Sequence, residues 1–255
     1  MLYLVGLGLK DEKSISIEGF EIVKRADYVF LESYTSKLVD FDINRLNSFF
    51  NKKVVPVERD FVENTKKIIE LSVDKDVVLL VVGDPMIATT HIDLVLEAEE
   101  KGVEVRIINN ASVINAVANL GLQVYKFGKI TSIPFPSKSF RPETPYNVIK
   151  ENKSINAHTL CLLDIQSEKG LFMSCDQGID YLLSIEEEKK QGVFTQDSLV
   201  VCCSGLGSEE QRVLFGRVKE LKKVLKEKLF VFPQCLIVPS KLHFMEEKAL
   251  KRFSI

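Results

Sequence analysis

Val77-Val78-Leu79-Leu80-Val81-Val82-Gly83-Asp84-Pro85 is the stretch of sequence that decides the fold. Its aliphatic residues run on without polar alternation, which is typical of a strand buried on both faces of a parallel sheet. The glycine and the proline then end the strand in a rigid turn. We therefore expect a central parallel strand whose carboxyl end holds the Asp84 carboxylate in one place.

On both sides of this stretch, short β-prone runs alternate with segments of helical period. The amino-terminal half shows predicted strands at 2–5, 28–31, 54–57 and 103–108, and Ser16 can cap the first helix between them. Such alternation predicts an α/β fold with a mostly parallel sheet.

The pattern changes after residue 110. Four prolines fall between residues 126 and 146, and further predicted strands lie at 159–164, 199–203 and 235–238. We expect two α/β domains, residues 1–110 with a mostly parallel sheet and residues 111–255 with a mixed sheet, and the helix that begins at Ser112 as the hinge between them.

Composition excludes several classes of protein. The chain has 255 residues, 45% of them hydrophobic, with 34 basic and 36 acidic side chains and a net charge of −2. It is therefore neither disordered nor collagen-like, and it has no basic surplus for gripping nucleic acid. No apolar run approaches the ~20 residues of a membrane span. We expect a cytoplasmic protein with no signal peptide, no membrane segment and no nucleic-acid partner.

Cysteine and histidine usage argues against a metal centre. The five cysteines show no C-x-x-C spacing, and the chain has only three histidines. Buried, reduced thiols in a reducing compartment are the simpler interpretation. The sequence also lacks a P-loop, a G-x-S-x-G elbow and an H-E-x-x-H motif, so it gives little support to hydrolysis by a catalytic triad or a metal.

Five turns that follow predicted strands carry small or polar residues. In open α/β sheets, ligands bind outside the carboxyl ends of the strands, so these turns are candidate ligand loops. Each also has a purely structural interpretation, as a tight turn, an Asx turn or a helix cap. The five are residues 5–9, 83–91, 109–114, 162–165 and 204–208.

Several segments, in order over nearly the whole chain, resemble the diphthine synthases. They are Leu4–Leu9, Glu32–Ser36, Gly83–His91, Tyr125–Lys129 and His158–Ile165. The resemblance implies a class III methyltransferase of the tetrapyrrole methylase fold, with S-adenosylmethionine in the cleft between two α/β domains and usually a homodimer.

The resemblance also implies the substrate. In this family it is one histidine of translation elongation factor 2 that already carries a 3-amino-3-carboxypropyl group, whose amino nitrogen is methylated repeatedly. The sequence of residues 159–165 resembles eukaryotic members more than archaeal ones, and the eukaryotic members add a fourth methyl on the carboxylate and produce diphthine methyl ester. The sequence does not fix whether three or four methyl groups are added.

Site residues are carried over from matching motif positions. The resemblance implies cofactor contacts from Leu9, Asp84, Ile87, Ser112, Val113, Leu163, Leu206 and Gln234. Gln234 stands where many relatives have a histidine, and residues 204–208 depart from the usual A-R-x-G. For the substrate carboxylate, the nearest local basic set is Lys126, Lys129, Lys138 and Arg141.

Methyl transfer from a sulfonium depends on orientation rather than on acid–base chemistry. An α-amino group has an unperturbed pKa of roughly 7.7–8.0, so an appreciable neutral fraction exists near pH 7. We therefore assign no catalytic acid or base. Two other functions stay open on the sequence: a methylase of small tetrapyrroles with the same fold, and a non-catalytic nucleotide-binding protein.

Overall fold

The computed structural model describes residues 1–34, 36–137, 140–229 and 231–255. They form two compact units, which are described separately. The first unit comprises Met1–Ala116 and Gln166–Gly170, and the second comprises Val117–Ile165 and Leu171–Ile255. The first unit thus runs past residue 110 and includes the short helix α6 (Val113–Ala116) that follows Ser112.

The first unit is built on a five-stranded sheet in the order β3-β2-β4-β1-β5. All neighbouring strands are parallel, as predicted. The strand expected to be central, β4, lies between β1 and β2 and is fully buried. The strands are β1 (Leu2–Gly6), β2 (Tyr28–Glu32), β3 (Val54–Val57), β4 (Val77–Val81) and β5 (Val105–Ile108).

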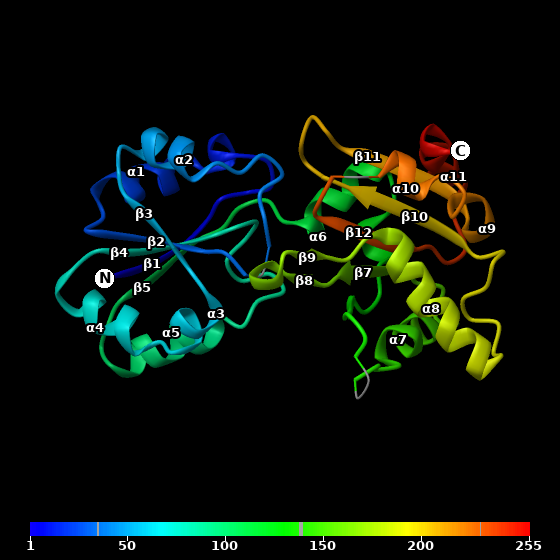
Figure 1. Ribbon diagram of the computed structural model, residues 1–255, viewed down its shortest axis with the longest axis horizontal. Coiled ribbons are helices and arrows are strands. Elements are labelled where there is room, and N and C mark those ends of the chain that lie inside the picture. The colour runs from blue at the N-terminus through cyan, green and yellow to red at the C-terminus, as the bar shows by residue number, and fades with distance from the viewer. Residues whose placement is uncertain (35, 138–139, 230) are drawn as a thin grey trace. The chain divides into compact units, whose positions relative to one another are not determined.

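Helices cover both faces of this sheet (Figure 1). Helices α1 (Ile17–Arg25) and α2 (Ile43–Phe50) bury Ile22 and Phe50 on one face. On the other face, α3 (Arg59–Glu63), α4 (Lys66–Asp74) and α5 (Ile92–Glu100) bury a second cluster. The Ser16 hydroxyl caps α1 by accepting a hydrogen bond from Gly19 N at 3.0 Å, as the sequence predicts.

Strand order places a topological switch point in this sheet. The chain leaves β1 toward β2 on one side, and it leaves β4 toward β5 on the other. The carboxyl ends of β1 and β4 are neighbours, with Gly6 opposite Val81. Ligands of open α/β sheets bind at such a point, so these two strand ends are the first place to look for a site.

The second unit has a mixed five-stranded sheet in the order β11-β10-β12-β7-β6. Only β6 and β7 are parallel; the other neighbours are antiparallel, which confirms the expected mixed sheet. Its strands are β6 (Thr131–Ile133), β7 (Thr159–Leu163), β10 (Leu199–Ser204), β11 (Arg212–Arg217) and β12 (Gln234–Val238), and β8 (Ile165–Gln166) pairs with β9 (Leu171–Phe172) in a separate hairpin.

Helices of the second unit include two long ones that pack on its core. These are α7 (Thr144–Ser154) and α8 (Cys175–Lys189). The shorter helices are α9 (Val218–Leu221), α10 (Leu225–Lys228) and α11 (Phe244–Leu250), and the 3-10 turns along the chain are η1 (Glu12–Ser14), η2 (Val117–Leu120), η3 (Val124–Lys126), η4 (Ser167–Lys169) and η5 (Lys251–Phe253).

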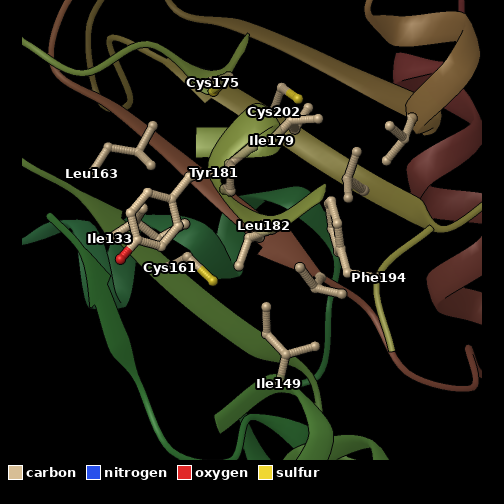
Figure 2. Close-up of a cluster of buried hydrophobic side chains, with 14 of the residues drawn as sticks. Ile133, Ile149, Cys161, Leu163, Cys175, Ile179, Tyr181, Leu182, Phe194 and Cys202 are labelled. Atoms are coloured by element: carbon tan, nitrogen blue, oxygen red, sulfur yellow. The ribbon is translucent and has the colours of Figure 1, made fainter. Parts of the chain in front are cut away.

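Cysteine side chains take part in the core of the second unit. Figure 2 shows Cys161, Cys175 and Cys202 beside Ile179 and Leu182. All five cysteines are free and buried, and burial raises the pKa of the Cys161 thiol well above its usual range. Among the described residues, no group of three or more acidic, histidine or cysteine side chains could hold a metal ion. Nor does any helix of the described chain have the length and apolarity to cross a membrane.

Candidate functional site at the strand ends

Two glycines lock the ends of β1 and β4 together. Gly83 N donates to Gly8 O at 2.8 Å, and Gly8 N donates to Gly83 O at 3.1 Å. Both residues have positive φ angles, 74° and 79°, which favour glycine. A Cβ at Gly6 would lie 2.6 Å from Gly83 O, so that position also requires glycine. The turns expected from the sequence at residues 5–9 and 83–91 are one unit in space.

Asp84 ties this unit to the end of β5. One carboxylate oxygen accepts from Met86 N at 2.9 Å, and the other accepts from Asn109 Nδ2 and Asn110 N, both at 3.0 Å. The Asn110 amide donates in turn to Gly6 O at 2.9 Å and Ser14 O at 3.0 Å. The buried carboxylate therefore joins the turn after β4 to the end of β5, and the Asn110 side chain extends the connection to β1.

The segment after Asp84 presents one apolar side chain to solvent. Ile87 is 36% exposed, and Ala88 beside it has a φ of 56°, unusual for a residue with a side chain. Thr89 Oγ1 donates to Pro85 O at 3.0 Å, and His91 Nδ1 lies 2.8 Å from the same oxygen. These bonds hold the segment in a turn, so α5 begins only at Ile92.

Ser112, Val113 and Leu9 lie around the same strand ends. Ser112 Oγ accepts from Ile114 N at 3.2 Å, and Ser112 N donates to Asn115 Oδ1 at 2.8 Å, so Ser112 acts as the expected helix cap. Val113 and Leu9 are half-buried. The first unit thus gathers five of the predicted cofactor contacts at one edge of its sheet: Leu9, Asp84, Ile87, Ser112 and Val113.

The remaining three predicted contacts lie at one edge of the second sheet. Strand β12 runs antiparallel to β7, and Cys235 pairs with Leu162, so the end of β7 lies beside the start of β12. Gln234 pairs in turn with Ser204 at the end of β10. Leu206 follows β10 there, between Gly205 and Gly207 of positive φ. Leu163 packs on α8, where a Cβ at Gly178 would lie 2.8 Å from its Cδ2.

The Gln234 side chain is fully engaged within its own unit. Its Oε1 accepts from Cys175 N, the first residue of α8, at 2.8 Å. Its Nε2 donates to Val231 O at 3.2 Å and Leu229 O at 3.4 Å. The amide therefore positions the amino end of α8.

Three of the four basic residues predicted to hold a substrate carboxylate are described by the structure, and each pairs with a different glutamate. Lys126 Nζ lies 2.6 Å from the buried Glu246, and Lys129 pairs with exposed Glu151. Both precede β6 and so lie at the end of the second sheet opposite Leu163. Arg141 pairs with Glu188 on α8, and Lys138 is outside the described residues.

Sequence reasoning missed the roles of Asn110 and His91. Asn110 connects the ends of β1 and β5, and the only local signal is an Asn-Asn pair directly after a strand. His91 is buried, and its Nε2 has no hydrogen-bond partner among the described residues. Its Nδ1 faces a carbonyl oxygen, so Nδ1 carries the proton and Nε2 is an acceptor.

Comparison with known proteins gives the class and then the family. Residues 1–222 match the family described as Tetrapyrrole (Corrin/Porphyrin) Methylases, so the protein is an S-adenosylmethionine-dependent methyltransferase. A diphthine synthase of Methanococcus maripaludis (strain S2) is 43% identical over 253 residues, and one of Methanocaldococcus jannaschii is 44% identical over 255 residues, each pair covering 98% of both chains. A solved structure titled as diphthine synthase has a TM-score of 0.89 at 41% identity, covering 99% of this chain and 95% of that one. The chain belongs to the diphthine synthases of the tetrapyrrole methylase family, and its activity is methylation in diphthamide biosynthesis.

The residues at the switch point fit a nucleoside-type methyl donor. Gly83 itself is buried, and a Cβ there would lie 3.8 Å from Ala111 O and 3.9 Å from the Ser112 side chain, which are ordinary contact distances. Ile87, which follows this turn, and Ala111, which precedes Ser112, are exposed, so apolar side chains and backbone groups near the strand ends are accessible to a ligand. Backbone groups beside apolar side chains suit a nucleoside, which offers hydrogen-bonding edges and an apolar ring face.

Proposed function

We propose that this chain methylates the 3-amino-3-carboxypropyl group on one histidine of translation elongation factor 2. The amino nitrogen receives methyl groups in succession, and the carboxylate receives a fourth, which gives diphthine methyl ester. The observation that carries the proposal is the pair of interlocked glycine turns at the switch point, in a chain that matches diphthine synthases over its whole length.

We assign the S-adenosylmethionine contacts to both sheet edges. The proposed residues are Leu9, Asp84, Ile87, Ser112 and Val113 from the first unit and Leu163, Leu206 and Gln234 from the second. Asp84 and Gln234 act indirectly, because their polar atoms already hold neighbouring backbone groups. Asp84 shapes the turn that presents Ile87 and joins it to the end of β5, and Gln234 positions the start of α8.

The chemistry requires little proton transfer by the protein. S-adenosylmethionine supplies a methyl group on a sulfonium, which has a good leaving group. A substrate amine with a pKa of roughly 7.7–8.0 is partly neutral at pH 7, so the chain's residues need only orient it and exclude water. We therefore assign no general base.

For the substrate carboxylate we retain Lys138 and Arg141. Both follow β6 in the chain, whereas Lys126 is held by Glu246 and Lys129 lies with it at the far end of the sheet. Arg141 pairs with an exposed glutamate, and such a pair is weak enough to be exchanged for a substrate group. The expected result of Arg141→Ala is a higher KM for elongation factor 2, and an unchanged KM would remove Arg141 from the site.

We further propose that the protein works in the cytoplasm as a homodimer. Five free, buried thiols suit a reducing compartment. The homodimer follows from the family resemblance, and sedimentation equilibrium of the purified chain tests it directly, since a single species of monomer mass contradicts it.

One assay tests the proposed reaction. Elongation factor 2 carrying the unmethylated 3-amino-3-carboxypropyl histidine is incubated with the chain and S-adenosylmethionine labelled in its methyl group. We expect label in the factor, and the mass of the modified residue counts the methyl groups added. Absence of label in the factor, or transfer to a tetrapyrrole under the same conditions, would overturn the proposal.

A further inference from the structure

An exposed apolar patch lies on the second unit, at the end of its sheet opposite Leu163 and Gln234. We call it the Tyr125 patch. Its members are Val124 and Tyr125 on η3 and Phe244 and Met245 at the start of α11, with exposed fractions of 56%, 97%, 69% and 52%. A tyrosine that is almost fully exposed beside other exposed apolar side chains marks an interaction site more often than a bare surface.

A buried carboxylate joins the two segments that make the patch. Glu246 accepts from Gln123 N at 2.9 Å and from His243 N at 2.7 Å. It also accepts from Lys126 Nζ at 2.6 Å, and Lys126 donates in turn to Lys241 O at 2.7 Å. The residues that flank Val124 and Tyr125 are thus fixed to those that flank Phe244 and Met245.

This bonding makes the patch a preorganised surface. If its two short segments separated, the groups that donate hydrogen bonds to Glu246 would lose their acceptor, which costs free energy. Aromatic side chains have only two torsions to immobilise, so on a fixed backbone they lose little conformational entropy when they bind, and aromatic residues are enriched among the hot spots of interfaces. Tyr125 and Phe244 are therefore the expected anchors.

The size of the patch suits a transient contact with a macromolecule. A large aromatic side chain buries roughly 150–250 Å², so the four residues offer about 500 Å². That value is at the upper end of ordinary apolar patches, and it is below the ~800 Å² per partner of a standard interface. Polar residues around the patch must supply the rest of the contact.

The surroundings of the patch carry a positive surplus. Lys241, Lys248 and Arg252 lie on α11 or beside it, and no carboxylate among the described residues forms an ion pair with them. Glu247, the nearest exposed acid on the helix, is already paired with Lys251. The second unit as a whole has 19 basic and 15 acidic residues, whereas the first has 15 and 21.

The charges decide between possible occupants. If two copies met through this same patch, two surroundings with the same positive surplus would face each other, which opposes association. A protein with an apolar hollow flanked by carboxylates complements the patch in both respects. Such a partner is a different protein rather than a second copy of this chain.

The patch lies one strand length from the proposed cofactor contacts of the same unit. Residues 123–129 lead into β6, and residues 239–243 follow β12, whereas Leu163 and Gln234 stand at the other ends of their strands. Five residues of strand span about 16 Å. A small molecule does not bridge that distance, but a folded protein substrate does.

We propose that the Tyr125 patch is the docking surface for the protein substrate of the methyl transfer, which it engages through an acidic-rimmed apolar hollow on that protein. This inference rests on the proposed function only in requiring a protein substrate. Docking away from the reacting group keeps a large substrate bound while the methyl donor is replaced between successive transfers, and it raises affinity without touching the chemistry.

The test compares steady-state kinetics of matched variants with modified elongation factor 2 as substrate. For Tyr125→Ala and Phe244→Ala we expect the KM for the factor to rise about 30-fold, the size of a hot-spot truncation. The kcat and the affinity for S-adenosylmethionine, measured by calorimetry, stay unchanged. Ile17→Ala, an equally exposed apolar residue of the first unit, is the control and leaves the KM unchanged.

A charge variant tests the rim separately. We expect Lys248→Glu to raise the KM and to flatten its dependence on salt, whereas Lys223→Glu, an exposed lysine elsewhere in the unit, does neither. A KM within twofold of wild type for both Tyr125→Ala and Phe244→Ala overturns the docking surface. So does a change from dimer to monomer in Tyr125→Ala during sedimentation, since the patch is then a contact between copies. If the wild-type chain does not label the factor at all, the proposed function itself fails.

Discussion

Replacing Glu246 with glutamine removes the charge of a buried side chain that accepts four hydrogen bonds. Besides Lys126 and two backbone N–H groups, the carboxylate faces His158 Nε2 at 3.1 Å. His158 Nδ1 accepts from Ser240 N at 3.0 Å, so Nε2 carries the proton and donates to Glu246. Glutamine keeps the shape of the side chain but leaves the Lys126 ammonium without a counter-charge.

The expected loss of folding free energy follows from the pKa of Glu246. Burial alone would raise this pKa, but hydrogen bonds from His243 N, Lys126, Gln123 N and His158 outweigh it and lower the pKa from 4.5 to about 2. The difference corresponds to about 3 kcal/mol of folding free energy. We expect Glu246→Gln to lose about that much at pH 7, and Glu246→Ala to lose ~3–5 kcal/mol because four donors are left unpaired.

Urea denaturation followed by circular dichroism measures this loss. Because the folded pKa is lowered, the stabilisation is complete above pH 4.5 and declines as the pH falls toward 2. The difference in free energy of unfolding between wild type and Glu246→Gln should therefore be smaller by roughly 1 kcal/mol at pH 4 than at pH 6. Glu247→Gln is the control, since its exposed pair with Lys251 contributes less than ~0.5 kcal/mol. A difference in free energy of unfolding below about 1 kcal/mol at pH 7, or one that does not become smaller in acid, refutes the claim that the Glu246 charge stabilises the fold.

Three further predictions concern the site and the core. Asp84→Ala removes the acceptor that joins the turn after β4 to the end of β5, so the affinity for S-adenosylmethionine should fall at least tenfold (about 1.4 kcal/mol) while the chain stays folded; undiminished binding in calorimetry contradicts the assignment. Gln234→Ala leaves Cys175 N at the start of α8 without an acceptor and should cost ~1–3 kcal/mol in urea denaturation; a loss within ~0.5 kcal/mol, the range of ordinary surface substitutions, shows that the amide does not hold the helix. The five buried thiols should react with a disulfide reagent only after unfolding, and rapid reaction of any one in the native chain shows that it is accessible.

Local pattern predicts much of this fold because the deciding signals lie close together in the chain. The aliphatic run from Val77 gives β4 and its central place, and the change of pattern after residue 110 gives a second, mixed sheet. The turns can be predicted in the same way, because a positive φ angle favours glycine and glycine is read directly from the sequence.

Partners that are far apart in the chain could not be predicted from one sequence. Lys126 was expected to bind substrate because it stands in a local group of cations, but its counter-charge is Glu246, 120 positions further along. The interactions of Asn110 with Gly6 O and of Gln234 with Cys175 N are of the same kind. Each joins an ordinary polar residue to a backbone group, and neither residue has a distinctive neighbour in the sequence.

The reciprocal bonds between Gly8 and Gly83 have a consequence for protein engineering. Each turn supplies both the donor and the acceptor that the other needs, and Gly6 must also stay small beneath them. The two turns are therefore one inherited part, although 75 positions separate the two glycines in the chain. Transplanting the Gly-Asp-Pro segment alone into another α/β scaffold should give a disordered loop, whereas transplanting it together with the first strand and its glycines keeps both halves of the interlocked pair.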